Sequence, residues 1–161
     1  MALGMTNFID NFAERLYASG IANEDDPLIG CSQEEISEIE NKVGVRLPAI
    51  YKAFLLKMGR STGDYLRGEE RCYPHLLTLT DSGRELLVES NTDYRLPPTA
   101  FVFWMSEGVS FAFFDTAKGD DPPVYHYKED DPQPSHRLDG FSHWLDFLLA
   151  SELELRERLK K

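Results

Sequence analysis

Four residues in the last quarter of the sequence carry side chains that could bind a metal ion. They are three imidazoles and one carboxylate: His126, Asp130, His136 and His143. Zinc is held tetrahedrally by such groups, so these four could form a site if the last strands and the last helix converged. A chain with 4 histidines and 28 acidic residues produces loose groupings of this kind readily. We therefore expect no metal site.

The same region contains two acidic loops, at residues 115–123 and 129–134. The first includes Asp120 and Asp121, and the second includes Glu129, Asp130 and Asp131. Acid/base catalysis needs two carboxyl groups whose environments separate their pKa values, whereas adjacent acids in proline-rich loops stay hydrated and alike. Calcium is a further alternative, but no EF-hand spacing is present. The pattern favours solvated carboxylates, with no catalytic role and no cofactor.

Sequence motifs for the common catalytic nucleophiles and phosphate-binding loops are missing. The sequence contains no G-x-S-x-G, no G-x-x-x-x-G-K-[ST], no G-x-G-x-x-G and no H-E-x-x-H. These motifs mark the hydrolase, nucleotide-binding and zinc-protease chemistries. We predict no catalytic residue, and an unrecognised hydrolase remains only the third hypothesis.

The acidic loops flank a predicted strand, residues 124–128, that contains two tyrosines. Tyrosine beside carboxylates is typical of an interface for a partner rich in arginine and lysine. Because side chains alternate along a strand, both tyrosines would point to the same face. Burial of both tyrosines in the core is an equally open alternative. The predicted partner-binding set is Asp120, Asp121, Tyr125, Tyr127, Glu129, Asp130 and Asp131.

Charge and composition limit the class of partner. The formal net charge is −11, and no window carries the basic stripe that binding to nucleic acid requires. A basic protein partner, captured with the help of electrostatic steering, is the better hypothesis.

The same composition bears on the cellular location. No apolar run reaches the ~18 residues that span a bilayer, and Asp10 and Glu14 lie where a signal peptide would carry positive charge. Cys31 and Cys72 have no C-x-x-C spacing, so we expect reduced thiols. These features predict a cytoplasmic protein with no membrane segment.

Two amphipathic helices within residues 32–59 form the framework that must position these loops. Ser32 and Glu35 match a capping box at the start of the first helix. Gly44 can supply the left-handed residue that ends it. Pro48 is suited to the first position of the second helix, which we expect to run to Gly59. The apolar residues of both helices fit the core of a scaffold.

The remaining elements predict an α+β fold in a single domain, residues 1–161, with a mostly antiparallel sheet of four to six strands. We expect a helix at 6–20, a short strand at 76–79, a helix at 81–90, a central hairpin at 100–114 and strands at 124–128 and 136–138. The sheet would therefore span residues 76–138. A last helix, residues 140–157 and capped by Asp139, would cover one face.

The helix pair resembles the opening signature of the SUKH superfamily. The matching residues, in order and spacing, are Glu40, Gly44, Val45, Leu47, Pro48, Tyr51, Phe54 and Leu55. Val124-Tyr125 and the Phe141–Leu145 stretch, which includes Trp144, resemble the end of the family pattern. The resemblance covers most of residues 32–150. It departs after Leu55, where Met58-Gly59-Arg60 replaces the usual Asn-Gly-Gly.

This resemblance implies a protein-binding domain without catalysis. The superfamily includes bacterial immunity proteins, so the first hypothesis is a protein that neutralises a basic, nuclease-type toxin. It also includes fungal regulators of cell-wall glucan synthesis, so the alternative is an intracellular regulatory or scaffolding module. The resemblance leaves the oligomeric state open.

Overall fold

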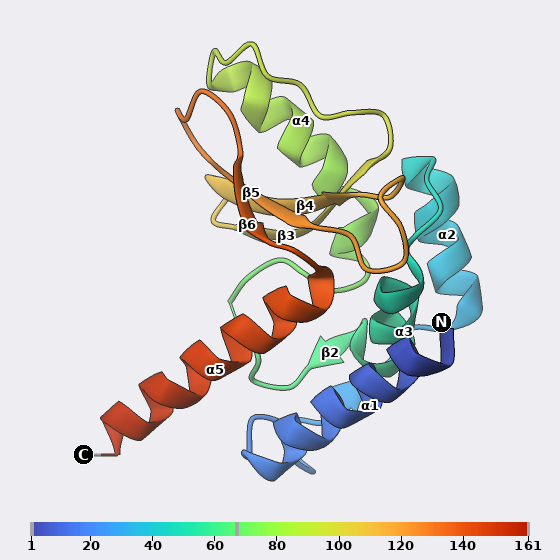
Figure 1. The fold of residues 1–161 in the computed structure, drawn as a ribbon, viewed down its shortest axis with the longest axis vertical. Coiled ribbons are helices and arrows are strands. Elements are labelled where there is room, and N and C mark those ends of the chain that lie inside the picture. The colour runs from blue at the N-terminus through green and yellow to red at the C-terminus, as the bar shows by residue number, and fades with distance from the viewer. Residues whose placement is uncertain (1, 67, 161) are drawn as a thin grey trace.

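A computed structural model describes residues 2–66 and 68–160 and confirms the predicted α+β fold (Figure 1). Its helices are α1 (Ala2–Ala18), α2 (Gln33–Val43), α3 (Ala49–Met58), the 3-10 helix η1 (His75–Leu77), α4 (Leu79–Glu89) and α5 (Phe141–Leu159). The strands are β1 (Leu28–Ile29), β2 (Ser61–Thr62), β3 (Ala100–Ser106), β4 (Ser110–Asp115), β5 (Val124–Lys128) and β6 (Ser135–Leu138). β1 pairs with β2, and the other four form an antiparallel sheet in the order β3-β4-β5-β6.

The capping box predicted at the start of α2 is confirmed. The Glu35 backbone N–H donates to Ser32 Oγ at 3.1 Å, and the Ser32 N–H donates to Glu35 Oε1 at 2.9 Å. Gly44 ends the helix with φ at 80°, in the left-handed region where a side chain would be strained. Pro48 is the residue before α3 rather than its first helical residue, so that prediction was off by one position.

The hairpin predicted within residues 100–114 is confirmed, but its place in the sheet was predicted wrongly. Glu107 and Gly108, the first two of the three residues that join the strands, both have positive φ, which is common in tight hairpin loops. β3 is an edge strand, although we expected it to be central. It is apolar on both faces because α4 packs against it on one face and core aromatic rings cover the other. A bridge between Glu70 and Met105 protects part of its edge.

Residues 76–79, predicted as a strand, instead form η1 and the start of α4, so the sheet begins at Ala100 and not at residue 76. Leu76 and Leu79 are buried, as the apolar pattern indicated. An apolar run of four residues fits a buried strand and a buried helical turn equally well. In the folded chain α4 is brought so close to the sheet that a Cβ on Gly83 would lie 3.0 Å from Val102.

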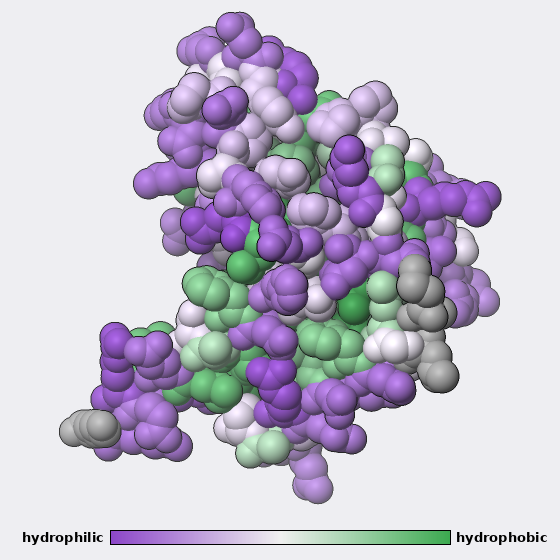
Figure 2. Space-filling model, viewed as in Figure 1, coloured by the Kyte–Doolittle hydropathy of each residue, from purple (hydrophilic) through white to green (hydrophobic). Residues whose placement is uncertain are grey.

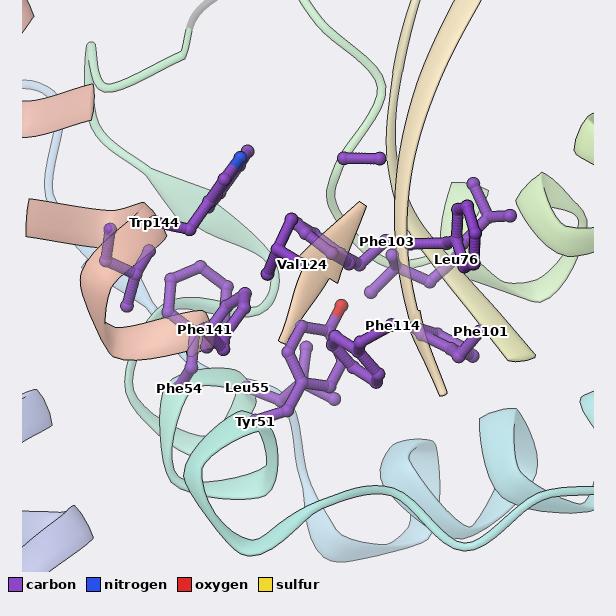
Figure 3. Packing of buried hydrophobic residues seen from close by; sticks show 14 of the residues in the cluster. Tyr51, Phe54, Leu55, Leu76, Phe101, Phe103, Phe114, Val124, Phe141 and Trp144 are labelled. Atoms are coloured by element: carbon purple, nitrogen blue, oxygen red, sulfur yellow. The ribbon is translucent and has the colours of Figure 1, made fainter. Parts of the chain in front are cut away.

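An aromatic core joins α3, the sheet and α5 (Figure 3). The ring of Tyr51 lies 5.2 Å from that of Phe141 and 5.3 Å from that of Phe114. Trp144 packs edge-on against Phe103 at 4.8 Å. Edge-to-face pairs of this kind stabilise a core beyond their buried area.

The cap of α5 does not come from Asp139, so that prediction was wrong. Gly140 occupies the N-cap position and Asp139 is exposed. Asp121, from the loop before β5, accepts the backbone N–H of Ser142 at 2.9 Å and the Ser142 hydroxyl at 2.6 Å. A residue distant in the sequence thus satisfies a free N–H at the start of the helix.

Candidate protein-binding surface

The predicted partner-binding acids lie at opposite ends of β5. Asp120 and Asp121 precede its first residue, whereas Glu129, Asp130 and Asp131 follow its last. A strand rises about 3.4 Å per residue, so a five-residue strand separates the two groups by roughly 17 Å. The seven residues predicted as one surface therefore do not form one cluster.

The backbone of Asp120 and the side chain of Asp121 help to hold the fold together. The backbone carbonyl of Asp120 accepts the N–H of Ile50 at 3.1 Å, which ties this loop to the first turn of α3. Both carboxylate oxygens of Asp121 accept hydrogen bonds from Ser142. Asp121 is half-buried at the N-terminal end of α5, so its role here is structural.

The two tyrosines of β5 share a face, and it is the face that α4 covers. The register places Tyr127 opposite Phe111 and Tyr125 opposite Phe113. Tyr127 is 0% exposed, and its hydroxyl donates to the carbonyl of Asp131 at 2.9 Å. Of the two alternatives left open for Tyr127, burial in the core is confirmed, and an outward position facing a partner is not. Tyr125 is half-buried and stacks on Phe113 at 5.6 Å.

The remaining predicted acids belong to a group at one corner of the molecule, which we call the acidic corner. Its members are Glu89, Asp93, Glu107, Glu129, Asp130 and Asp131, all exposed. Figure 2 shows this end, where α4 and the adjoining loops lie in Figure 1, as an almost continuous hydrophilic surface.

Three turns meet at the acidic corner. The Asp130 N–H donates to Ser90 Oγ at 3.4 Å, and the hydroxyl of Thr92 donates to the carbonyl of Pro132. The Glu129 N–H donates to the carbonyl of Val109 at 2.7 Å, next to the turn of the β3–β4 hairpin. These contacts bring Glu89, Asp93 and Glu107, which the sequence analysis did not select, beside the predicted acids.

The carboxylates of the acidic corner carry a charge that the described residues do not neutralise. None of the six lies within 4 Å of a cationic group in residues 2–66 and 68–160, whereas Asp10 and Asp146 elsewhere are paired with Lys57 and Arg15. The last turn of α4 holds no basic residue that would offset the negative end of the helix dipole.

Two cations also lie in the segments that form this corner. Arg95 directs its guanidinium to the backbone carbonyls of Thr92 and Tyr94, at 2.6 and 2.7 Å. Lys128 is exposed at the end of β5. Six carboxylates against these two cations leave a net negative surface.

The histidines predicted as an alternative metal site have different surroundings. His126 lies beside Trp104, with 5.7 Å between ring centroids, and burial, with a smaller contribution from Arg137, lowers its pKa. His136 packs at a tilt against Tyr125, which projects from the opposite face of β5. No group of three or more described His, Cys, Asp or Glu residues could hold a metal ion together.

The residues that resembled a family signature lie in the hinge and the core. Glu40 Oε2 accepts the N–H of Leu47 at 2.7 Å and lies 3.5 Å from Lys52 Nζ, which holds the chain between α2 and α3. The buried members are Val45, Leu47, Pro48, Tyr51, Phe54, Leu55 and Trp144. These residues position the loops and contribute little surface.

The described helices were also compared with the length and hydropathy that a membrane span requires. Within residues 2–66 and 68–160, none is both long and apolar enough to cross a bilayer.

The sequence matches the model of a known protein family. Residues 30–146, more than half of the chain, match the SMI1 / KNR4 family (SUKH-1). This stretch runs from the residues before α2 to the first turns of α5 and includes both the helix pair and the four-stranded sheet. No protein in the curated set matches the chain.

Proposed function

Because this chain belongs to the SMI1 / KNR4 family (SUKH-1), we propose that it is a non-enzymatic protein-binding domain that neutralises a basic, nuclease-type toxin. The observation that carries the proposal is the acidic corner, where six exposed carboxylates lie on three adjoining turns. None of the six forms an ion pair with a basic side chain in the described residues. A nuclease binds phosphates through lysine and arginine, so its active-site surface has the complementary charge.

Electrostatics gives such a protein a kinetic advantage. Clustered charges of one sign raise the association rate with an oppositely charged partner, and the increase falls as salt screens the field. An immunity protein has to capture its toxin before the toxin reaches nucleic acid. It can do so by covering the basic surface, without any chemical step.

The alternative is a regulatory or scaffolding module, and co-expression separates the two. The toxin candidate is the product of a gene adjacent to the one that encodes this chain. We expect co-expression of this chain to restore growth to cells that produce the toxin. A module that leaves growth inhibited and instead binds several unrelated proteins would contradict the immunity function.

Charge reversal then tests the surface. In Glu129→Lys/Asp131→Lys two negative charges at the acidic corner are replaced by two positive ones, and we expect the association rate with the toxin to fall about 10- to 100-fold at low salt. The matched control, Glu24→Lys/Asp25→Lys, makes the same charge change in the exposed loop between α1 and β1. Stopped-flow experiments at several salt concentrations measure the association rates of both variants with the toxin. Equal rates for the two variants would show that the acidic corner is not the binding surface.

A further inference from the structure

A second surface has the opposite character from the acidic corner. A pocket of about 260 Å³ lies between β6 and α5, lined by His136, Arg137, Leu138, Trp144, Phe147 and Leu148. Phe147 is 53% exposed. Figure 2 shows hydrophobic residues along the course of α5 on this face of the molecule. A large exposed aromatic side chain beside an apolar pocket is typical of a surface that binds another molecule.

Arg137 is the one residue with a permanent charge among those that line this pocket, and that charge is positive, although the protein as a whole carries a charge of −11. No carboxylate is among the described residues that line it, and the exposed carboxylate of Asp139 lies 3.4 Å from His136 Nε2. In the register, Val124 pairs with Leu138 and Tyr125 with His136, so Arg137 is the extra residue of a β-bulge. Its exposed guanidinium makes no ion pair with any carboxylate in the described part of the chain. An unpaired arginine at the rim of an apolar pocket is suited to a carboxylate ligand.

The edge of the sheet borders the same pocket. β6 is the outermost strand, and its outer side pairs with no other described strand. Such an edge offers backbone donors and acceptors to an added strand. β6 has four residues and a bulge, so only a short segment can pair with it.

We propose that the groove between β6 and α5 binds a short extended segment of a partner protein, in which a large apolar side chain adjoins a carboxylate. The apolar side chain enters the pocket against Phe147 and Leu148, the carboxylate binds Arg137, and the main chain follows β6. This inference goes beyond the proposed function, because the ligand has the opposite charge from a basic toxin and binds a different surface. Either proposal can fail without the other.

Two pools of labelled pentapeptides test the inference. The first has Asp or Glu on both sides of a central Phe, Trp, Leu, Ile or Met, and the second has Lys or Arg in the same flanking positions. We expect the acidic pool to bind at least about 10-fold more tightly in fluorescence anisotropy. In NMR spectra of the ¹⁵N-labelled protein, the acidic pool should shift the amides of β6 and of the first half of α5. If it leaves these amides unshifted, or binds no better than the basic pool, the inference is wrong.

Two variants and two matched controls locate the site. Arg137→Glu should weaken binding of the acidic pool at least about 10-fold, and Phe147→Ser should abolish it. Arg46→Glu and Leu56→Ser change equivalent exposed residues outside the pocket and should bind as the parent does. Dispersed amide spectra establish that each variant is folded. Unchanged binding by Arg137→Glu would overturn the assignment.

Discussion

At the scale of single residues, the hydroxyl of Tyr51 is a polar group without a partner in an apolar core. Tyr51 is 1% exposed, and its hydroxyl makes no hydrogen bond with any residue that the structure describes. Figure 3 shows the oxygen among the carbon atoms of neighbouring side chains. Burying a hydroxyl without a partner costs free energy, so the ring stabilises this core while its hydroxyl opposes it. Burial also raises the pKa of Tyr51 well above its usual value.

Removing that hydroxyl should not destabilise the protein. We expect Tyr51→Phe to leave the free energy of unfolding unchanged or to raise it by up to about 1–3 kcal/mol, because the desolvation cost disappears. Tyr65→Phe is the matched control, since the Tyr65 hydroxyl donates to the carbonyl of Leu145 at 3.0 Å. The free energy of unfolding of Tyr65→Phe should be about 1 kcal/mol lower than that of the parent. Urea unfolding measures both, and a larger loss for Tyr51→Phe than for Tyr65→Phe would contradict this account.

His126 should make the stability depend on pH. Burial lowers its pKa, so below about pH 6.5 the unfolded chain binds a proton at this residue more readily than the folded chain does. The free energy of unfolding should therefore fall as the pH drops below that value. We expect His126→Gln to lose less stability than the parent between pH 7.5 and pH 5.5, measured by urea unfolding.

The control for this experiment is His143→Gln, because His143 is exposed on α5. That variant should follow the parent at both pH values. If His126→Gln and the parent lose the same stability on acidification, His126 is not the group responsible.

At the scale of elements, distant residues decide how helices begin and where they point. Glu40 holds the chain between α2 and α3 through the N–H of Leu47, seven residues further on. Asp121 holds the start of α5 by accepting the N–H of Ser142, which lies 21 residues further on. Both carboxylates satisfy a backbone N–H that would otherwise be unpaired. The acidic residues of this protein therefore fall into two groups. Glu40 and Asp121 accept backbone N–H groups and stabilise the fold, whereas the carboxylates of the acidic corner remain exposed to solvent.

Asp121 should be worth more to stability than Asp139. We expect Asp121→Ala to lower the free energy of unfolding by about 1 kcal/mol, since it removes the cap at the start of α5. Asp139→Ala should change it by less than about 0.5 kcal/mol, because the Asp139 side chain is 84% exposed. Thermal unfolding of the two variants provides the comparison. Equal effects would mean that the two hydrogen bonds from Ser142 contribute nothing to stability.

At the scale of the whole molecule, charge is distributed unevenly. The acidic corner lies at the end of α4, whereas the groove between β6 and α5 is lined by basic and apolar residues. The net charge of −11, which describes the whole chain, does not show this difference between the two surfaces. The two surfaces fit ligands of opposite charge, which would allow one protein to contact two partners at once.

The acidic corner should also cost some stability, since like charges close together repel. The variant Glu129→Lys/Asp131→Lys is therefore expected to melt at the same temperature as the parent or slightly higher, at low salt. Adding salt should reduce any difference, because screening weakens the repulsion. A lower melting temperature at all salt concentrations would show that these carboxylates stabilise the fold.

Local sequence signals predicted the parts of this structure that depend on nearby residues. The capping box at Ser32, the left-handed Gly44 and the hairpin within residues 100–114 all form as expected, because each depends on residues close together in the chain. The α+β class and the antiparallel pairing also follow from the hydrophobic period and the short connections. The resemblance of the helix pair to SUKH proteins agrees with the family match.

Only the tertiary structure decided which of the predicted site residues share a surface. Strand alternation placed Tyr125 and Tyr127 on one face, but it could not show that α4 covers that face. Nor could it show that Asp121 caps α5, or that Glu89, Asp93 and Glu107 join the acidic corner. The physical reason is that burial and proximity depend on contacts between segments far apart in the chain, whereas periodicity and capping are properties of neighbouring residues.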